Sequence, residues 1–125
     1  MILLDTHAMI WFMFDDSKLS ERAMNSIKSS DKVFVSIASL WEIAIKQSIG
    51  KLDIDISAHE LAEKCEDVDI AILPIKPGHL DKVKDLPFLH NDPFDRLIMA
   101  QAVTEGMALV TKDEKIAQYD INKIW

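Results

Sequence analysis

The residues Ile2-Leu3-Leu4-Asp5 open the chain as a short apolar run that stops at an acid. Such a run is typical of a strand that is buried on both faces of a parallel sheet. Similar runs recur along the chain, with helical patterns between them. They are Val33-Phe34-Val35, Ile70 to Leu73, Ala108 to Thr111 and Ile121 to Ile124. This alternation predicts an α/β fold, a three-layer sandwich around a mostly parallel sheet of four or five strands.

Signals at the helix ends support this order. Serine caps are expected at Ser20, Ser36 and Ser57, and Asp92-Pro93 has the pattern of a cap followed by proline at the first helical position. Asp113 is expected to cap a last short helix. The preceding helices are predicted to end near Phe14, Ser29, Ile49, Glu66, Lys84 and Glu105.

Length and composition limit the class of protein. A chain of 125 residues is long enough for one ordinary domain, so a single domain over residues 1–125 is expected. Cys65 is the only cysteine, which excludes an internal disulfide and fits a reducing cytoplasm. The longest apolar run, Ala8 to Phe14, is seven residues, whereas a membrane span needs about twenty. No membrane association and a cytoplasmic location are therefore expected.

The charge of the chain restricts its partners. The net charge of −7 argues against a passive nucleic-acid coat, which would normally be basic. It does not exclude an enzyme that acts on nucleic acid, because bound divalent cations would change the local sign of the charge.

Four acids are expected at the carboxyl edge of the sheet, where open α/β sheets bind ligands. Asp5 ends the first strand, and Asp113 follows the fourth strand by two residues. Glu42 lies in the first turns of the helix after the second strand, and Asp95 opens the helix that begins near residue 92. The four carboxylates therefore reach one edge from four separate elements.

Such a cluster requires protons or a cation. Two unit charges 4 Å apart repel by about 4 kcal/mol at an effective dielectric of 20. Oxygen ligands suit Mg²⁺ or Mn²⁺, which can activate water and stabilise charge on a phosphate. The sequence therefore predicts that Asp5, Glu42, Asp95 and Asp113 bind a metal ion and act as catalytic residues.

Each acid also has a purely structural interpretation. Asp5 and Asp113 could cap helices, Glu42 could complete a capping box begun by Ser39, and Asp95 favours its helix dipole. For each acid taken alone, the structural interpretation is at least as well supported as the functional one. Jointly they are weaker, because capping does not require four acids at four strand ends.

Other side chains near the acids allow two interpretations. Lys46, Arg96 and Lys112 either contact substrate phosphates or balance the acids. Packing or solvation is the preferred interpretation of His7 and His90. The aromatic residues Trp11 and Trp41 lie in apolar helices, so a place in the core is preferred to a base-stacking role.

Four blocks of the sequence are spread over nearly the whole chain: Leu3-Leu4-Asp5-Thr6-His7, Ser39-Leu40-Trp41-Glu42-Ile43-Ala44-Ile45-Lys46, His90-Asn91-Asp92-Pro93-Phe94-Asp95-Arg96-Leu97 and Val110-Thr111-Lys112-Asp113. In their order and spacing these blocks resemble a PIN domain, in particular the VapC-type toxins of toxin–antitoxin pairs.

The resemblance implies a Mg²⁺- or Mn²⁺-dependent endoribonuclease that cuts cellular RNA. It also implies a cognate antitoxin that holds the enzyme inactive, and a homodimer. Asp5, Glu42 and Asp95 match the family's three central acids, and Asp113 matches the more variable fourth. Positions that often help to hold the site are matched by Thr6 and Thr111. For the additional acid Asp92, helix capping is preferred to metal binding.

Three other functions stay open at this point. The same fold could cut a different RNA or a DNA. A phosphoacceptor domain also places acids at strand ends, although the usual paired acids are missing because Thr6 and His7 follow Asp5. A catalytically silent interaction module could also keep the fold.

Overall fold

The apolar runs form a five-stranded sheet in the computed structural model, which describes residues 1–125. The strand order is β3-β2-β1-β4-β5, and every neighbouring pair is parallel. The strands are β1 (Ile2–Leu4), β2 (Val33–Ser36), β3 (Ile70–Leu73), β4 (Ala108–Val110) and β5 (Lys123–Ile124). The predicted parallel α/β sheet is confirmed.

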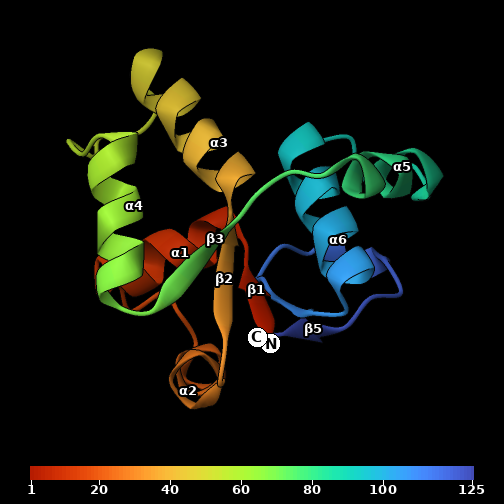
Figure 1. The fold of residues 1–125 in the computed structure, drawn as a ribbon, viewed down its shortest axis with the longest axis horizontal. Coiled ribbons are helices and arrows are strands. Elements are labelled where there is room, and N and C mark those ends of the chain that lie inside the picture. The colour runs from red at the N-terminus through yellow and green to blue at the C-terminus, as the bar shows by residue number, and fades with distance from the viewer.

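Helices cover both faces of this sheet, as Figure 1 shows: α1 and α4 lie on one side, and α5 and α6 lie on the other. The helices are α1 (Thr6–Met13), α2 (Glu21–Ser29), α3 (Ile37–Ser48), α4 (Ala58–Asp67), α5 (Pro77–Asp85) and α6 (Pro93–Glu105), followed by one turn of 3₁₀ helix, η1 (Ile116–Gln118). No helix combines the length and apolar character that a bilayer span requires.

The strands send alternate side chains into two separate cores. Ile2 and Leu4 of β1 pack into the core beneath α1, α2, α3 and α4, whereas Leu3 packs into the core beneath α6. In β4, Val110 belongs to the first core and Leu109 to the second. This alternation is the period of a strand with both faces buried, and it produces the three layers that the sequence predicts.

Local signals set most of the helix starts. The side chains of Ser20, Ser36 and Asp92 accept hydrogen bonds from backbone N–H groups in the first turns of α2, α3 and α6. Ser57 and Glu60 form the complete capping box of α4. Gly106 ends α6 in the left-handed region, with φ of 68°, where glycine avoids the steric cost of a Cβ atom.

The end of the chain differs from the prediction. Asp113 does not cap a helix: η1 begins only at Ile116, and the Asp113 carboxylate instead accepts a hydrogen bond from the backbone N–H of Lys115 (2.8 Å). The last strand is two residues long and pairs with Leu109 and Val110 alone. The helix expected from Asp113 is therefore replaced by a turn that leaves this side chain at the sheet edge.

The register of the central strands positions the site. Leu4 pairs with Val35 on one side and with Val110 on the other, so β1 and β4 end level with one another, and β2 extends one residue further, to Ser36. The residues that follow Leu4 and Val110, Asp5 and Thr111, therefore leave the sheet side by side.

Candidate metal centre

Asp5 lies at the centre of the carboxyl edge. Its backbone N–H still donates to Val110 in the sheet (3.0 Å), while its side chain caps α1 by accepting from the Ala8 N–H (2.8 Å). The residue is only 5% exposed. Asp5 therefore has the capping role considered above, and its second carboxylate oxygen is free of that bond.

The pKa of Asp5 is raised to about 6, chiefly because burial disfavours the charged form. Hydrogen bonds from the Thr111 side chain and the Ala8 backbone lower it, whereas the charges of Asp113 and Glu42 raise it further. Three of the four predicted acids thus lie within electrostatic range of one another.

Asp95 completes the cluster from the first turn of α6. Burial raises its pKa to about 6, a hydrogen bond from His90 lowers it, and the charges of Asp92 and Asp113 raise it. Asp113 acts on both Asp5 and Asp95, and Glu42 acts on Asp5, so each of the four predicted acids lies within electrostatic range of at least one other. Asp95 and Asp113 share a close group of ligand atoms with His90, whereas Asp5 and Glu42 are not members of that group.

Both carboxylate oxygens of Glu42 are held in place. The Thr6 hydroxyl donates to Oε1 (2.7 Å) and also shares a hydrogen bond with the Ser39 hydroxyl (2.9 Å). Lys46 pairs with Oε2 at 2.8 Å, one helical turn along α3. Of its two interpretations, Lys46 takes the one that balances an acid. Ser39 packs against Thr6 and does not cap α3, which Ser36 does.

Thr111 links Asp5 and Asp113. Its hydroxyl hydrogen-bonds to Asp5 and accepts from the backbone N–H of Asp113 (3.1 Å). The side chain is buried, whereas neighbouring Lys112 is exposed and belongs to none of the ion pairs in the structure. Thr111 therefore supports the site, and Lys112 is left available to a ligand.

Arg96 does not face the acids. Its guanidinium is buried and donates to the backbone oxygens of Val83, Leu86, Pro87 and His90 and to the Tyr119 hydroxyl, at 3.0 to 3.3 Å. It also lies over the Phe88 ring, 4.6 Å from the centroid. The interpretation as a phosphate contact is therefore wrong, because the guanidinium holds the loop that carries His90.

For His90 the preferred prediction is packing or solvation, whereas the structure places its ring in the site. Its Nε2 lies 2.7 Å from Asp95 Oδ2 and 3.8 Å from Asp113 Oδ2, and its ring is buried. The ligand atoms of these three residues all lie within 4.8 Å of one another. The signal available in the sequence was its place five residues before Asp95, where a loop can fold back over the first turn of a helix.

The surroundings of the second ring nitrogen decide the role of His90. Nδ1 is buried and has no hydrogen-bond partner. A histidine that binds metal through Nε2 carries its proton on the other nitrogen and normally donates it to an acceptor, which is absent here. The arrangement favours a proton on Nε2 that is donated to Asp95, so His90 positions this carboxylate.

The donor set fits a divalent cation. Carboxylate oxygens dominate it, and two of the carboxylates, Asp5 and Asp95, are largely removed from water without a lysine or arginine partner. Such groups are stabilised by Mg²⁺ or Mn²⁺, which prefer oxygen ligands.

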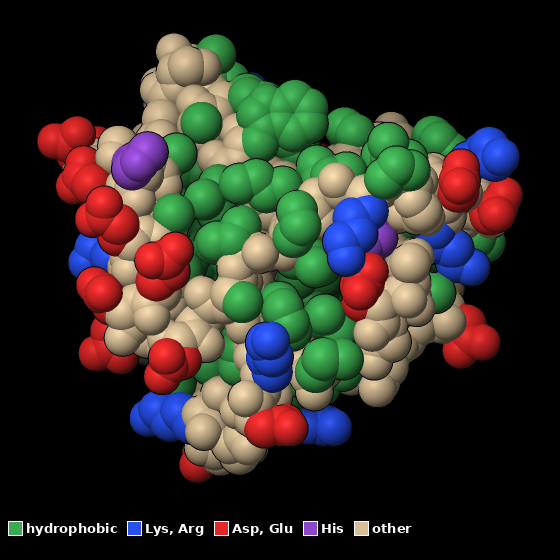
Figure 2. All heavy atoms as spheres, viewed as in Figure 1, with side chains coloured by type: hydrophobic (Ala, Val, Ile, Leu, Met, Phe, Trp, Pro, Cys, Tyr) green, Lys and Arg blue, Asp and Glu red, His purple; other side chains and the backbone are tan.

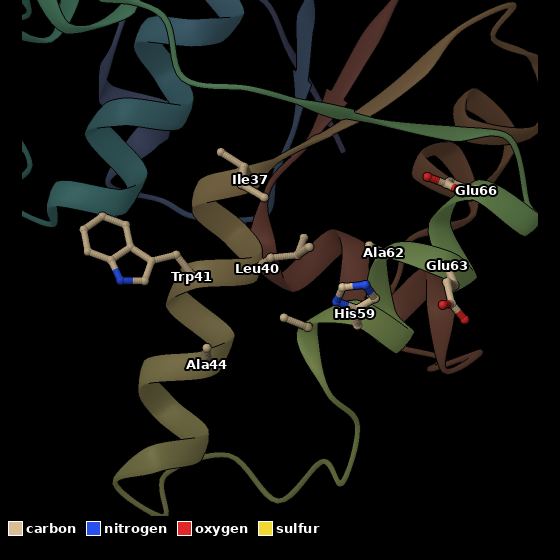
Figure 3. Close-up of a pocket in the computed structure, with 9 residues that line it drawn as sticks. Ile37, Leu40, Trp41, Ala44, His59, Ala62, Glu63 and Glu66 are labelled. Atoms are coloured by element: carbon tan, nitrogen blue, oxygen red, sulfur yellow. The ribbon is translucent and has the colours of Figure 1, made fainter.

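A large, mainly apolar groove lies elsewhere, between α3 and α4. Its volume is about 590 Å³, and hydrophobic side chains dominate its lining. Figure 3 shows His59 and Glu63 on the α4 side, while Trp41 extends from α3 toward α6, where its ring meets Phe94 with 5.0 Å between centroids. Trp41 is 57% exposed, so its predicted place in the core is wrong.

Comparisons with known proteins find similarity over nearly the full length of the chain. A family model described as PIN domain matches residues 2–122. The chain is 30% identical to Ribonuclease VapC22 from Mycobacterium tuberculosis, over 94% of this chain and 91% of that protein.

Solved structures share the fold. VapBC2 from Rickettsia felis, bound to a promoter DNA fragment, matches with a TM-score of 0.66 and 17% identity over 98% of this chain and 97% of that one. A toxin–antitoxin complex from Klebsiella pneumoniae matches with the same TM-score and 15% identity, over 96% and 93%.

Replacing Asp5 with asparagine should stabilise the metal-free protein. Since its pKa is raised from 3.8 to about 6, folded Asp5 holds its proton more tightly than unfolded Asp5, and wild-type stability should fall as pH rises from about 4 to about 6. In EDTA at pH 7, Asp5→Asn should gain roughly 1–3 kcal/mol in unfolding free energy, because asparagine keeps the cap acceptor without the charge.

Thermal unfolding between pH 4 and 8, in EDTA and in Mg²⁺, checks this. Mg²⁺ should raise the Tm of the wild type and of the control Asp67→Asn, an exposed acid of α4, more than that of Asp5→Asn. A lower Tm for Asp5→Asn in EDTA at pH 7 would contradict the electrostatic interpretation.

The role of His90 has its own test. His90→Gln, which can keep an N–H donor near the Nε2 position, should retain most of the Mn²⁺ affinity, whereas His90→Ala should lose about tenfold or more. Electron spin-echo spectroscopy of the Mn²⁺-loaded wild type should show no directly bound histidine nitrogen; such a signal would make His90 a ligand.

Proposed function

The chain belongs to the PIN-domain family, and from this premise we propose that it is a divalent-metal-dependent endoribonuclease, the toxin of a type II toxin–antitoxin pair. The observation that carries the proposal is the convergence of Asp5, Glu42, Asp95 and Asp113 at one sheet edge. The family match over residues 2–122 and the ribonuclease relative support it. We expect the enzyme to act in the cytoplasm.

We assign Mg²⁺, with Mn²⁺ as an alternative, to the oxygens of Asp5, Glu42, Asp95 and Asp113. When bound, the ion supplies an activated water and neutralises charge that develops on the phosphate. Asp5 and Asp95 contribute buried carboxylates that gain most from a cation, because their raised pKa values record the cost of their charge.

The neighbouring residues prepare this site for hydrolysis of a phosphodiester. Thr6 and Lys46 fix the two oxygens of Glu42, and His90 fixes one oxygen of Asp95, so the ligand oxygens need little reorganisation. Thr111 keeps Asp5 and Asp113 adjacent. Lys112 is the exposed cation nearest these acids in sequence and can meet a phosphate.

A cognate antitoxin is the proposed protein partner. The described structural relatives include toxin–antitoxin complexes. On this chain the α3–α4 groove is the surface that best suits a helix of the antitoxin, since it is large and mainly apolar and has Glu63 and Glu66 on its α4 wall. Figure 2 shows a band of hydrophobic side chains on this face, with acids along the α4 edge. An amphipathic helix with basic flanks would match both features.

Cleavage of RNA should require both the metal and Asp95. Purified wild type, incubated with a panel of labelled single-stranded and hairpin RNAs, should cut in Mg²⁺ or Mn²⁺ and not in EDTA. Asp95→Asn should lower the rate by at least about a hundredfold, because one carboxylate of the preorganised site is lost. Fragment lengths on denaturing gels provide the measurement.

The matched control is Asp55→Asn, an exposed acid of the α3–α4 loop, which should cut like the wild type. Metal binding is followed by calorimetry in parallel. If no RNA is cut and no divalent ion binds, the proposal fails in favour of a silent interaction module. Equal cleavage by Asp95→Asn and the wild type would remove the assignment of this residue.

A charge placed in the groove should weaken the antitoxin complex. Ala44→Arg puts a long cation on an apolar wall, and the amount of antitoxin that copurifies with the tagged toxin should fall about tenfold or more. Leu80→Arg on α5, an exposed apolar position outside the groove, should keep the complex. Both toxins also carry Asp95→Asn so that cells survive their expression. Equal recovery of antitoxin with both variants would place the partner elsewhere.

A further inference from the structure

A small cavity lies directly beside the candidate metal ligands. Its volume is about 280 Å³, and it is lined by Asp5, His7, Trp11, Lys112 and Asp113. One wall is the start of α1, and the other is the turn after β4. Since it contains two of the four acids, a group bound there would lie next to the bond that the site cuts.

The α1 wall is aromatic. His7 and Trp11 are one helical turn apart, and their rings stack with 5.4 Å between centroids and 15° between planes. Trp11 is held from behind, because it packs against the core and meets the edge of Trp125 at 5.7 Å. His7 is exposed. With one face of its ring covered by Trp11, the other face is the one that His7 presents to a ligand.

The opposite wall supplies a positive charge. Lys112 is exposed and forms no ion pair, although it adjoins Asp113. The other two basic residues predicted near the acids are already engaged, Lys46 by Glu42 and Arg96 by backbone carbonyls. Of these three basic residues, Lys112 is therefore the one that remains free to bind an anion.

From these features we infer that the cavity is a nucleotide subsite for unpaired RNA. A base stacks on the free face of His7, with Trp11 behind it, while Lys112 binds an adjacent phosphate. Aromatic rings, histidine included, accept the unstacked bases of single-stranded RNA, and lysine pairs with the backbone. The inference rests on the proposed ribonuclease function and adds which part of the substrate the chain recognises.

The chemistry of the subsite predicts its selectivity. Stacking accepts every base, because each has a π-face, so this subsite favours an exposed nucleotide rather than a particular sequence. A base inside a continuous duplex cannot lie on His7 without leaving its stack. Hairpin loops and single strands should therefore be preferred to duplex stems.

Steady-state cleavage of the best RNA from the panel tests the subsite. His7→Ala and Lys112→Gln should each raise KM about tenfold with kcat changed less than threefold, whereas His7→Phe, which keeps an aromatic face, should stay within threefold of the wild-type KM. The matched controls His59→Ala on α4 and Lys115→Gln beyond the cavity should leave KM unchanged. Circular dichroism verifies that each variant is folded.

A readout independent of cleavage uses the Asp95→Asn protein. Single-stranded RNA carrying 4-thiouridine, irradiated with the protein in Mg²⁺, should crosslink to the peptide that contains His7 and Trp11. The crosslink should diminish in His7→Ala and persist in His59→Ala. Crosslinks confined to other peptides would overturn the subsite.

The outcomes separate the two proposals. If the wild type cuts RNA but His7→Ala keeps its KM, the subsite is wrong and the nuclease stands. If the wild type neither cuts nor binds RNA, the proposed function itself fails. A His7→Phe variant as weak as His7→Ala would show that the imidazole, rather than an aromatic face, is required, which also overturns the stacking subsite.

Discussion

The burial of ionisable carboxylates at one edge of the sheet is the constraint on which the site depends. The parallel register of β1 with β4 makes these two strands end level, so Asp5 leaves the sheet beside Thr111 and close to Asp113. Helix α6 then brings Asp95 to the same place. The pKa values of Asp5 and Asp95 are raised mainly by their burial and further by the charges of neighbouring acids. Since both acids are largely ionised at neutral pH, a divalent cation is the compensation that the geometry allows.

Features that depend on neighbours in sequence could be predicted. The caps at Ser20, Ser57 and Asp92 act within three residues of themselves, and the buried strands appear as short apolar runs. The acids could be predicted for a related reason, because the end of a strand in a parallel sheet fixes which edge its next residue meets. In both cases a short segment, combined with a general rule of topology, determines the outcome.

Features that depend on distant partners could not be predicted. Arg96 adjoins Asp95 in sequence, yet its guanidinium donates to the carbonyls of Val83 in α5 and of Pro87 in the following loop. Tyr119 donates to the same Pro87 oxygen (2.7 Å). These contacts hold the loop that delivers His90 to Asp95. The position of Trp41 likewise depends on a distant residue. Its ring meets Phe94 at the boundary between α3 and α6 and stays partly exposed to solvent. Only the assembled fold shows that an apolar helix keeps one face in solvent.

The acidity of the whole chain gives these local arrangements their importance. With a net charge of −7, the protein offers little long-range attraction to a polyanion, so affinity for RNA must come from short-range contacts. Pairing Lys46 with Glu42 and burying Arg96 reduce the free positive charge near the acids further. Three sources of attraction remain, namely the cation held by the carboxylates, Lys112 and the stacked rings of α1. The two charges act over roughly 8–10 Å at physiological ionic strength, whereas stacking requires direct contact. Tight binding therefore favours a strand that can bring an unpaired nucleotide into the site.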